Sequence, residues 1–460
     1  MNEILEKFKN YVRGKRVALL GFGISNRAAV DFLLSMGVHL SVRDQNPDLD
    51  VDEAARLSSL GVHMIFGAHY LEDITEDIVL KSPGIRYDVP ELLAAAERGS
   101  VLTSEMEIFV SLCPATIFAV TGSDGKTTTT TVTAKMLETT GKRVYLGGNI
   151  GTPLLSRVGE MTAEDYVVLE LSSFQLHTMR FSPAVAIVTN VTPNHLNWHT
   201  SMEEYVESKK NIYLSQMSDA RLVLNAENEI TREMAKGAPS VVTLFSSKRK
   251  PENAPCCYYE NETIYYDEGD GAKAIMTRAD IKIVGMHNVE NYMAAISAVM
   301  GHVSAEGMRE VAHTFGGVRH RIELVAQKRG VRYYNSSIDS SPTRSLAALA
   351  SFDEPLIVIA GGYDKHIPLE PLIPALAAKA KKIVLTGQTG VMLLSLLLDY
   401  GYPRGNIAYI GDFDAAVRYA ASMAREGDTV LLSPAAASFD AFKNFEARGD
   451  RFCELVREIK

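Results

Sequence analysis

Short apolar runs recur along this chain, and stretches with the spacing of amphipathic helices separate them. Runs of four or five apolar residues are typical of strands that are buried on both faces of a parallel sheet. We predict strands at residues 16–20, 40–44, 117–120, 166–170, 184–190, 356–360, 383–385, 406–410 and 429–432. Strands that alternate with helices predict an α/β fold with mostly parallel sheets.

The predicted strands fall into groups along the chain, which indicates several domains. A chain of 460 residues is too long for one hydrophobic core and suggests about three domains. We expect a Rossmann-like domain at 1–103, a central ATPase-like domain with a phosphate loop and a mostly parallel sheet at 104–317, and a second Rossmann-like domain at 318–460. The polar stretch 246–272, rich in Pro, Asn and Gly, predicts a loop-and-hairpin excursion.

The central segment contains a phosphate-binding motif of unusual length. The run Gly122-Ser123-Asp124-Gly125-Lys126-Thr127-Thr128 follows strand 117–120 and precedes a threonine-rich helical stretch. The common G-x-x-x-x-G-K-[ST] pattern would need glycine where this chain has Val120. In this context backbone N–H groups and the helix dipole point at phosphate oxygens, Lys126 adds a charge, and Thr127 can bind Mg²⁺. The motif predicts binding of a nucleoside triphosphate.

A second glycine turn opens the first segment. Strand 16–20, the run Gly21-Phe22-Gly23, a helix at 26–36 and strand 40–44 form a βαβ unit. Asp44 lies about 20 residues past the glycines, as in dinucleotide folds. The third glycine of G-x-G-x-x-G is replaced here by Asn26. We therefore expect a Rossmann-like sheet that binds a nucleotide-like group, and NAD stays open as an alternative ligand.

Composition narrows the choice of partners and compartment. The chain is 46% hydrophobic and 22% charged, which is ordinary for a soluble globular protein, and its net charge is −9. Because no long Lys/Arg run is present, we expect no nucleic-acid partner and no membrane partner. The four cysteines lack a C-x-x-C pair, the N-terminus lacks a signal-peptide pattern, and no apolar run has bilayer length. These features predict a cytoplasmic protein.

Three polar residues lie at positions that are typical of metal-binding or catalytic side chains. Glu170 ends the strand 166–170, and a carboxylate there is the usual second contact to nucleotide-bound Mg²⁺. His195 follows strand 184–190, at the edge where open α/β sheets bind ligands. Lys209 falls on the apolar face of a helix predicted at 202–217. Such a lysine pairs with an acid, lowers its pKa, is chemically modified, or reaches out to the rim.

Together these motifs resemble the Mur ligases, the ATP-dependent amide-bond ligases of peptidoglycan precursor synthesis. The resemblance extends over residues 21–448. Its motifs are the short phosphate loop, Glu170-Leu171-Ser172-Ser173-Phe174-Gln175-Leu176, the Asn-x-x-x-Asn-His run that ends at His195, and His287-Asn288-x-x-Asn291. The tail at 432–449, with Lys443-Asn444-Phe445-Glu446-Ala447-Arg448-Gly449, is similar to the branch that adds D-glutamate to UDP-N-acetylmuramoyl-L-alanine.

The resemblance implies two substrate sites. The residues that would contact UDP-N-acetylmuramoyl-L-alanine are Gly21, Ile24, Ser25, Asp44, Gln45, Ser82, Asn149, Ser172 and His195. The residues that would bind D-glutamate are Lys365, Ser438, Phe439 and Phe445. A cation in the second site suits an amino acid that carries two carboxylates.

The resemblance also implies an ATP site with two Mg²⁺ ions. ATP would contact Gly122, Ser123, Asp124, Gly125, Lys126, Thr127, Thr128, Asn288, Asn291, Arg321 and Ser336. The metal ligands would be Thr127, Glu170, His195 and Lys209, the last as a carbamate formed with CO₂, and the catalytic residues Lys126, His195, Lys209 and Arg321. The chain departs from the family at Ser336, because an aspartate near the ATP ribose is usual there.

The function that the resemblance implies is the ATP-dependent addition of D-glutamate through an acyl phosphate, by a cytoplasmic monomer. Two alternatives stay open. One is another ligase of the superfamily, either L-alanine-adding or a folylpolyglutamate synthase, although the latter has no need of a UDP-sugar domain at 1–103. The other is a nucleotide-binding ATPase module without ligase activity, for which the Leu-Ser-Gly-Gly-Gln signature of transport ATPases is missing.

Overall fold

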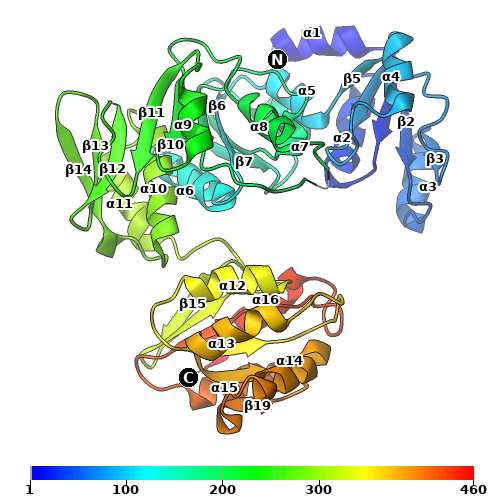
Figure 1. Cartoon of the computed structure of the whole chain (residues 1–460). Coiled ribbons are helices and arrows are strands. Elements are labelled where there is room, and N and C mark those ends of the chain that lie inside the picture. The colour runs from blue at the N-terminus through cyan, green and yellow to red at the C-terminus, as the bar shows by residue number, and fades with distance from the viewer. Residues whose placement is uncertain (1–2, 197, 254, 460) are drawn as a thin grey trace. The chain divides into compact units, whose positions relative to one another are not determined.

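The computed structural model describes residues 3–196, 198–253 and 255–459, and these residues form three β-sheets (Figure 1). The chain divides into two compact units. One consists of Met1–Arg278 with Glu290–Val311 and contains the first and second sheets, and the other consists of Ala279–Val289 with Ala312–Lys460 and contains the third. The predicted α/β class with mostly parallel sheets is confirmed.

The first sheet is parallel throughout, in the strand order β3-β2-β1-β4-β5. Its elements are α1 (Glu3–Val12), β1 (Arg16–Leu20), α2 (Ile24–Ser35), β2 (His39–Asp44), α3 (Val51–Ser59), β3 (His63–Phe66), β4 (Ile78–Lys81), α4 (Pro90–Glu97) and β5 (Val101–Thr103). After β1 the chain forms β2 and β3 on one side of this strand, and it then forms β4 and β5 on the other side. The carboxyl ends of β1 and β4 therefore form a topological switch point, where open α/β sheets bind ligands.

Burial on both faces explains the apolar run of β1. Val17 and Leu19 pack on the side of Leu33 in α2, whereas Ala18 and Leu20 pack on the side of Leu92 in α4. Successive residues of a strand point to opposite faces, so a strand covered by helices on both sides needs apolar side chains at every position.

The second sheet has nine strands in the order β14-β13-β12-β11-β10-β9-β6-β8-β7. Its strands are β6 (Thr116–Thr121), β7 (Val144–Gly148), β8 (Tyr166–Glu170), β9 (Val185–Val188), β10 (Arg221–Asn225), β11 (Val241–Ser246), β12 (Cys256–Glu260), β13 (Thr263–Asp267) and β14 (Ala272–Thr277). The strands from β12 to β7 are parallel, and β13 and β14 are antiparallel to their neighbours. The helices of this segment are α5 (Glu105–Leu112), α6 (Lys126–Glu138), η1 (Leu155–Glu160), α7 (Ser173–Leu176), α8 (Met202–Lys210), α9 (Glu229–Ala235), η2 (Arg278–Asp280), α10 (Met286–Val299) and α11 (Ala305–Thr314).

Three predictions for this segment need correction. The hairpin predicted within 246–272 is present as β12 and β13, but it extends the sheet instead of leaving it, and β14 begins at the end of the stretch. Strand β9 ends at Val188 rather than at 190, since the next two residues turn to bond the phosphate loop. Helix α8 ends at Lys210 rather than at 217. The side chain of the next residue, Asn211, donates to the carbonyl oxygen of Leu176 at 2.8 Å.

The third sheet has the order β15-β16-β20-β17-β18-β19, in which β15 is antiparallel and the other strands are parallel. Its strands are β15 (Glu323–Lys328), β16 (Val331–Asn335), β17 (Leu356–Ala360), β18 (Ala380–Leu385), β19 (Ile407–Tyr409) and β20 (Thr429–Leu432). Its helices are α12 (Pro342–Ala350), η3 (Glu370–Leu372), α13 (Ile373–Lys379), α14 (Gly387–Asp399), η4 (Arg404–Asn406), α15 (Phe413–Met423) and α16 (Phe445–Glu458). Because β17 lies between β18 and β20, the carboxyl ends of β17 and β20 form another switch point.

Two further features agree with the composition. The four cysteines are free thiols. Among the described residues, none of the helices combines the length and the apolar character that a bilayer-spanning segment requires.

Candidate functional site

The loop between β6 and α6 requires glycine at two positions. Gly122 and Gly125 have φ angles of 147° and 79°, which favour glycine. A Cβ atom would lie 1.9 Å from Thr189 Oγ1 if added to Gly122, and 2.3 Å from Asn291 Oδ1 if added to Gly125. Val120, where a longer loop has glycine, is instead a fully buried residue of β6. The short motif is thus a tight turn from strand to helix.

The end of β9 holds this loop in place. The Asn190 side chain and main chain accept hydrogen bonds from the N–H groups of Asp124 and Ser123, both at 2.9 Å. Thr189 Oγ1 donates to the carbonyl oxygen of Asp124 at 2.6 Å, and Ser123 Oγ lies 2.9 Å from Tyr205 Oη. The supporting role of Thr189 and Asn190 could not be predicted from the sequence, because only the strand order brings β9 beside β6.

Two lysines meet at the carbonyl oxygen of Gly122. Lys126 Nζ donates to it at 3.0 Å and to the carbonyl oxygen of Ser123 at 2.9 Å, and Lys209 Nζ donates to it at 2.8 Å. Lys209 is 1% exposed, and its Nζ lies 4.6 Å from the centre of the Tyr205 ring. Of the alternatives left open for Lys209, the one in which its side chain reaches the rim is excluded, because the side chain is buried. Burial, followed by the charge of Lys126, lowers the pKa of Lys209 well below its usual value.

Glu170 lies beside the same loop, at the end of β8. The register of β6 and β8 pairs it with Val120. Its side chain is buried, Oε1 accepts a 2.9 Å hydrogen bond from Asn149 Nδ2, and Oε2 has no hydrogen-bond partner among the described residues. A buried carboxylate oxygen without a partner fits a hard cation, for which carboxylates are preferred ligands. Asn149, expected at the UDP-sugar, bonds Glu170 in this structure.

His195 follows β9 with a φ angle of 56°, in the left-handed region. Its ring packs edge-on against Phe174, with ring centres 4.9 Å apart. Partial burial lowers the pKa of His195, and the charges of Lys126 and Lys209 lower it further. A neutral imidazole is the form that binds a metal ion. The structure therefore gathers Lys126, Lys209, Glu170 and His195 around one loop, as expected for a nucleotide and Mg²⁺ site.

Asn291, on α10, also reaches this loop. Its Oδ1 accepts a hydrogen bond from Thr129 Oγ1 at 3.2 Å and lies next to Gly125. Ser172, expected at the UDP-sugar, caps α7 by accepting from the N–H group of Gln175 at 3.3 Å. The structure therefore brings Asn291 to the phosphate loop and gives Ser172 a role in local structure.

The candidate UDP-sugar residues of the first sheet lie at its switch point. Gly21 follows β1, and a Cβ added there would lie 2.5 Å from Ser82 Oγ, which follows β4. Asp44, at the end of β2, accepts from the N–H group of Phe22 at 2.5 Å. Asn26, in place of a third glycine, donates to the carbonyl oxygens of Leu20 and Gly21 and closes the turn.

Other residues of this group begin α2 or follow β2. Ile24 is 79% exposed at the start of α2, Ser25 follows it, and Gln45 follows Asp44. An exposed isoleucine at a switch point is available to a ligand.

The candidate D-glutamate residues of the third sheet are only partly brought together. Lys365, after β17, places its Nζ 5.6 Å from the centre of the Phe439 ring, and a small pocket is lined by Lys365, Thr389 and residues 435–437. Ser438 is buried directly after this stretch. Phe445 instead packs against the ring of His320, with centres 6.2 Å apart.

Arg448 holds the loop of this pocket. The buried guanidinium donates to the carbonyl oxygens of Ala436, Ala437 and Ser337 and to Ser337 Oγ. Burial lowers the pKa of Arg448 to about 10, so it stays charged at neutral pH. Arg448 belongs to the motif at 443–449, and its role in the structure is to fix this loop.

Arg321 occupies a strained turn. Its neighbours His320 and Ile322 have φ angles of 62° and 44°, and the latter is unusual for a β-branched residue. Ser336, expected at ATP, is fully buried and accepts from the N–H group of Ile322 at 3.3 Å. Ser336 thus supports the turn that carries Arg321. Asn288, also expected at ATP, donates to the carbonyl oxygen of Val284 at 2.6 Å.

These features define the class of the protein. Three α/β sheets, the central one with a short phosphate loop, a buried lysine and a buried carboxylate, are the architecture of the Mur ligases, and the chain belongs to this family. It matches the models of the Mur ligase MurD-like N-terminal domain at 15–104, the Mur ligase middle domain at 120–299, and the Mur ligase glutamate ligase domain at 320–436.

Two named relatives are similar to this chain over their whole length. The chain is 48% identical to the UDP-N-acetylmuramoylalanine--D-glutamate ligase of Acetivibrio thermocellus and 45% identical to that of Clostridium perfringens, with 100% of both chains covered in each case. Among solved structures, UDP-N-acetylmuramate-alanine ligase MurC from Thermotoga maritima matches with a TM-score of 0.57 at 20% identity, covering 97% of this chain and 100% of that one. The structural match supports the fold.

Proposed function

We propose that this chain is the ATP-dependent ligase that joins D-glutamate to UDP-N-acetylmuramoyl-L-alanine in the cytoplasmic synthesis of peptidoglycan precursors. Full-length similarity to ligases of this name supports the substrates. The single observation that carries the chemistry is the meeting of Lys126, Lys209 and Glu170 at the phosphate loop, with one oxygen of Glu170 left without a partner. This arrangement suits a phosphoryl group with its metal ions.

We further propose a division of labour along the chain. Residues 1–103 bind the UDP-sugar, with Gly21, Ser82 and Asp44 at the switch point of the first sheet. Residues 104–317 bind ATP at the phosphate loop. Residues 318–460 bind D-glutamate near Lys365.

The first step that we propose is activation of the substrate carboxylate. An oxygen of the L-alanine carboxylate attacks the γ-phosphorus of ATP, the bond to the β-phosphate oxygen breaks, and ADP leaves an acyl phosphate behind. Lys126 and the loop amides hold the phosphates in line, which is the main task of a protein in phosphoryl transfer. Thr127, Glu170, His195 and modified Lys209 would hold two Mg²⁺ ions, which neutralise the developing charge when they are bound.

The modification of Lys209 follows from its environment. Burial and the charge of Lys126 lower the pKa of Lys209, which favours the neutral, nucleophilic form of its amine. Its Nζ attacks the carbon of CO₂ and releases one proton, which leaves a carbamate anion on the side chain. The change converts a poorly tolerated buried cation into an oxygen ligand for Mg²⁺.

The second step forms the amide bond. The neutral amine of D-glutamate attacks the acyl carbon, loses a proton, and expels inorganic phosphate from the tetrahedral intermediate. The ammonium group of Lys365 is the proposed partner of a D-glutamate carboxylate. Arg448 keeps the loop around Ser438 in position for this amino acid.

The test is phosphate release from ATP in the presence of UDP-N-acetylmuramoyl-L-alanine and D-glutamate, L-glutamate, L-alanine or no acceptor. We expect release only with the UDP-sugar and D-glutamate together, with a product of the ligated mass. Release only with UDP-N-acetylmuramate and L-alanine, tested in a separate arm, would identify the L-alanine-adding branch, and release without any UDP-sugar would leave only an ATPase. Lys126→Ala should abolish turnover, whereas Lys135→Ala on the same helix, an exposed lysine paired with Glu138, should not.

A further inference from the structure

One charged cluster connects the first sheet to the second and is not used by the chemistry above. The loop after β4, which contains Ser82, continues to Arg86. The guanidinium of Arg86 pairs with Glu204 on α8, with Nη2–Oε1 and Nη1–Oε2 distances of 2.8 and 3.2 Å. Asp88 binds the same guanidinium at 2.7 and 2.8 Å and orients it. The pair is largely shielded, since the Arg86 and Glu204 side chains are 19% and 22% exposed.

Trp198 reinforces the contact between the same two segments. Its indole Nε1 donates to the carbonyl oxygen of Gly84 at 3.0 Å, and its own carbonyl oxygen accepts from Arg86 Nη1 at 2.9 Å. The Arg86 guanidinium also lies over the indole ring, 4.9 Å from its centre. These bonds fix both the main chain and the side chains of the loop after β4 against the segment that follows His195.

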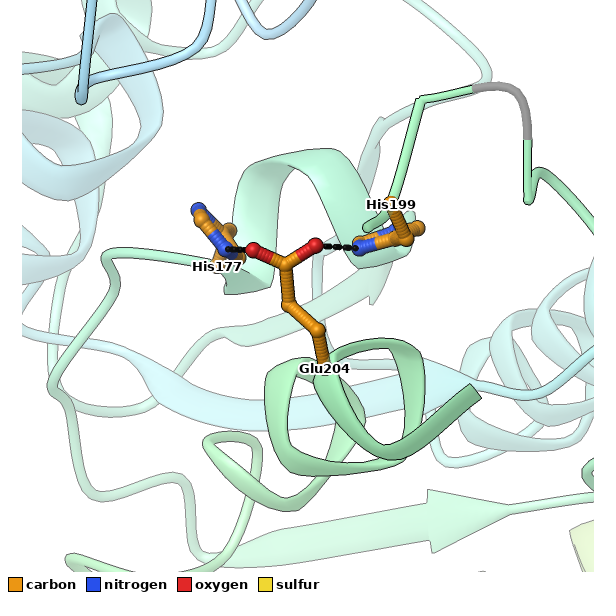
Figure 2. Close-up of side chains that lie close together, drawn as sticks. All are labelled: His177, His199 and Glu204. Atoms are coloured by element: carbon orange, nitrogen blue, oxygen red, sulfur yellow. Dashed lines mark hydrogen bonds and ion pairs between the residues drawn. The ribbon is translucent and has the colours of Figure 1, made fainter. Parts of the chain in front are cut away.

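Glu204 is the centre of the cluster. Besides Arg86, its carboxylate accepts from the N–H group of Thr200 at 2.6 Å and lies 3.1 Å from His177 Nε2 and 3.5 Å from His199 Nδ1 (Figure 2). The guanidinium of Arg86 is the largest cause of the lowered pKa of Glu204. Main-chain segments from three places in the sequence thus converge on one carboxylate.

Each of these segments also carries a residue of the proposed magnesium site. His177 ends the α7 turn that begins directly after Glu170-Leu171-Ser172. The main-chain N–H of His199 donates to the carbonyl oxygen of His195 at 3.0 Å. Lys209 is five positions after Glu204 on α8. A displacement of Glu204 would therefore move all three segments that supply the proposed metal ligands.

His177, His199 and Glu204 also have the composition of a metal site, since one ligand atom from each lies within 4.8 Å of the others. The surroundings favour an ion-pair network instead. Both oxygens of Glu204 already accept hydrogen bonds from Arg86, and a divalent cation would have to sit beside that guanidinium. Two cations next to each other in a shielded site repel strongly.

We propose that Arg86 and Glu204 are positioning residues that hold the loop after Ser82 in register with the segments carrying Glu170, His195 and Lys209. The inference rests on the proposed function, in which Ser82 contacts the UDP-sugar whose carboxylate reacts at the magnesium site. The pair would set the distance between the place where the UDP-sugar is held and the place where its carboxylate is phosphorylated. Loss of the pair should weaken productive binding of that substrate and leave ATP binding nearly intact.

The test compares Arg86→Met, Arg86→Lys and Glu204→Gln with the control Arg56→Met. Arg56 is also an arginine with two acidic partners in the first unit, Glu53 and Asp31, but it makes no bond to the second sheet. We expect Arg86→Met to raise the KM for UDP-N-acetylmuramoyl-L-alanine about tenfold or more. The KM for ATP should stay within about twofold, and the variant that combines Arg86→Met with Glu204→Gln should be no worse than the single variants. Arg86→Lys keeps the positive charge but cannot make the paired hydrogen bonds of the guanidinium to Glu204. This variant replaces Arg86→Met in the test if Arg86→Met does not fold.

Trp198 gives a readout that does not depend on turnover, because it is the only tryptophan in the sequence. Its emission should shift to longer wavelength and its quenching by acrylamide should increase in the Arg86 and Glu204 variants, and neither should change in Arg56→Met. If the spectral changes occur but the wild-type protein never uses the UDP-sugar, the contact stands and the proposed function fails. Equal effects on both KM values, or an unchanged KM and spectrum, would overturn the positioning role. Stoichiometric binding of Zn²⁺ that is lost in His177→Ala and tightened in Arg86→Met would overturn it in favour of a metal site.

Discussion

The side chains of Lys126 and Lys209 donate to the same acceptor, the carbonyl oxygen of Gly122, at 3.0 and 2.8 Å. They come from different helices, α6 and α8, and meet at one peptide group of the phosphate loop. Burial and the neighbouring charge of Lys126 together lower the pKa of Lys209. This environment therefore favours the neutral, nucleophilic form of the Lys209 amine.

Replacement of this amine tests its proposed modification. Lys209→Met keeps the apolar stem but removes the nitrogen that would form the carbamate. We expect kcat to fall by about 10- to 100-fold, because a magnesium ligand is lost. A carbamate signal in the ¹³C NMR spectrum of protein exposed to ¹³CO₂ should be present in the wild type and absent in the variant. Lys210→Met, on the same helix but paired with Glu207, is the matched control and should keep full activity; a fully active Lys209→Met would refute the modification.

Removal of the charge on Glu170 should separate metal binding from folding. Glu170→Gln retains an oxygen that can accept from Asn149 but lacks the anionic oxygen that has no partner among the described residues. We expect the half-saturating Mg²⁺ concentration in the ligase assay to rise about 10-fold or more. The thermal midpoint without Mg²⁺ should not fall, since a buried charge is removed. The exposed Glu160→Gln should change neither quantity, and an unaltered Mg²⁺ dependence in Glu170→Gln would exclude it as a ligand.

The glycines of the phosphate loop allow two sources of strain to be measured separately. Gly125 and Gly141 have nearly equal φ angles, 79° and 78°, but a Cβ would clash with Asn291 only at Gly125. Gly141→Ala should therefore cost about 1 kcal/mol of unfolding free energy from backbone strain alone. Gly125→Ala should cost more and should also weaken ATP binding, measured by calorimetry. Equal costs at the two positions would show that the clash with Asn291 is relieved without strain.

The raised pKa of Asp339 predicts that the stability of the second unit depends on pH. Burial raises the pKa of its carboxyl to about 7, although the hydroxyl groups of Ser336 and Ser433 act in the opposite direction. An aspartate in an unfolded chain ionises near pH 4, at about 3.9. Between about pH 4 and pH 7 the unfolded chain has lost a proton that the native state keeps, so stability falls as pH rises, by about 1.4 kcal/mol per pH unit.

Asp339→Asn cannot ionise and should remove this decline. Thermal unfolding followed from pH 4 to 8 should show that the variant gains stability relative to the wild type as the pH rises through this window, and that the difference levels off above it. The exposed Asp353→Asn is the control and should follow the wild-type profile. A constant difference between Asp339→Asn and the wild type at all pH values would contradict the raised pKa.

The parts of the site that are contiguous in sequence could be predicted well. The phosphate loop depends on a strand, a glycine turn and a helix that are adjacent in the chain, and the buried face of α8 follows from the spacing of its side chains. The predicted length of α8 was wrong: the helix ends at Lys210, and the next residue, Asn211, donates to the carbonyl oxygen of Leu176, which is distant in sequence. The hairpin predicted within 246–272 is present as β12 and β13, but its place as an extension of the central sheet depends on the pairing of β12 with β11, which no local pattern shows.

The sequence alone determined the three α/β segments, the short loop that requires Gly122 and Gly125, and the position of Lys209 on the apolar face of its helix, because each depends on side-chain periodicity or turn geometry within a few residues. Only the tertiary structure decided that Asn149 bonds Glu170, that Asn291 abuts Gly125, and that Arg86 pairs with Glu204. These contacts join residues from 21 to 166 positions apart. Their partners are set by the order and register of strands in a sheet, which no local pattern of apolar and polar residues specifies.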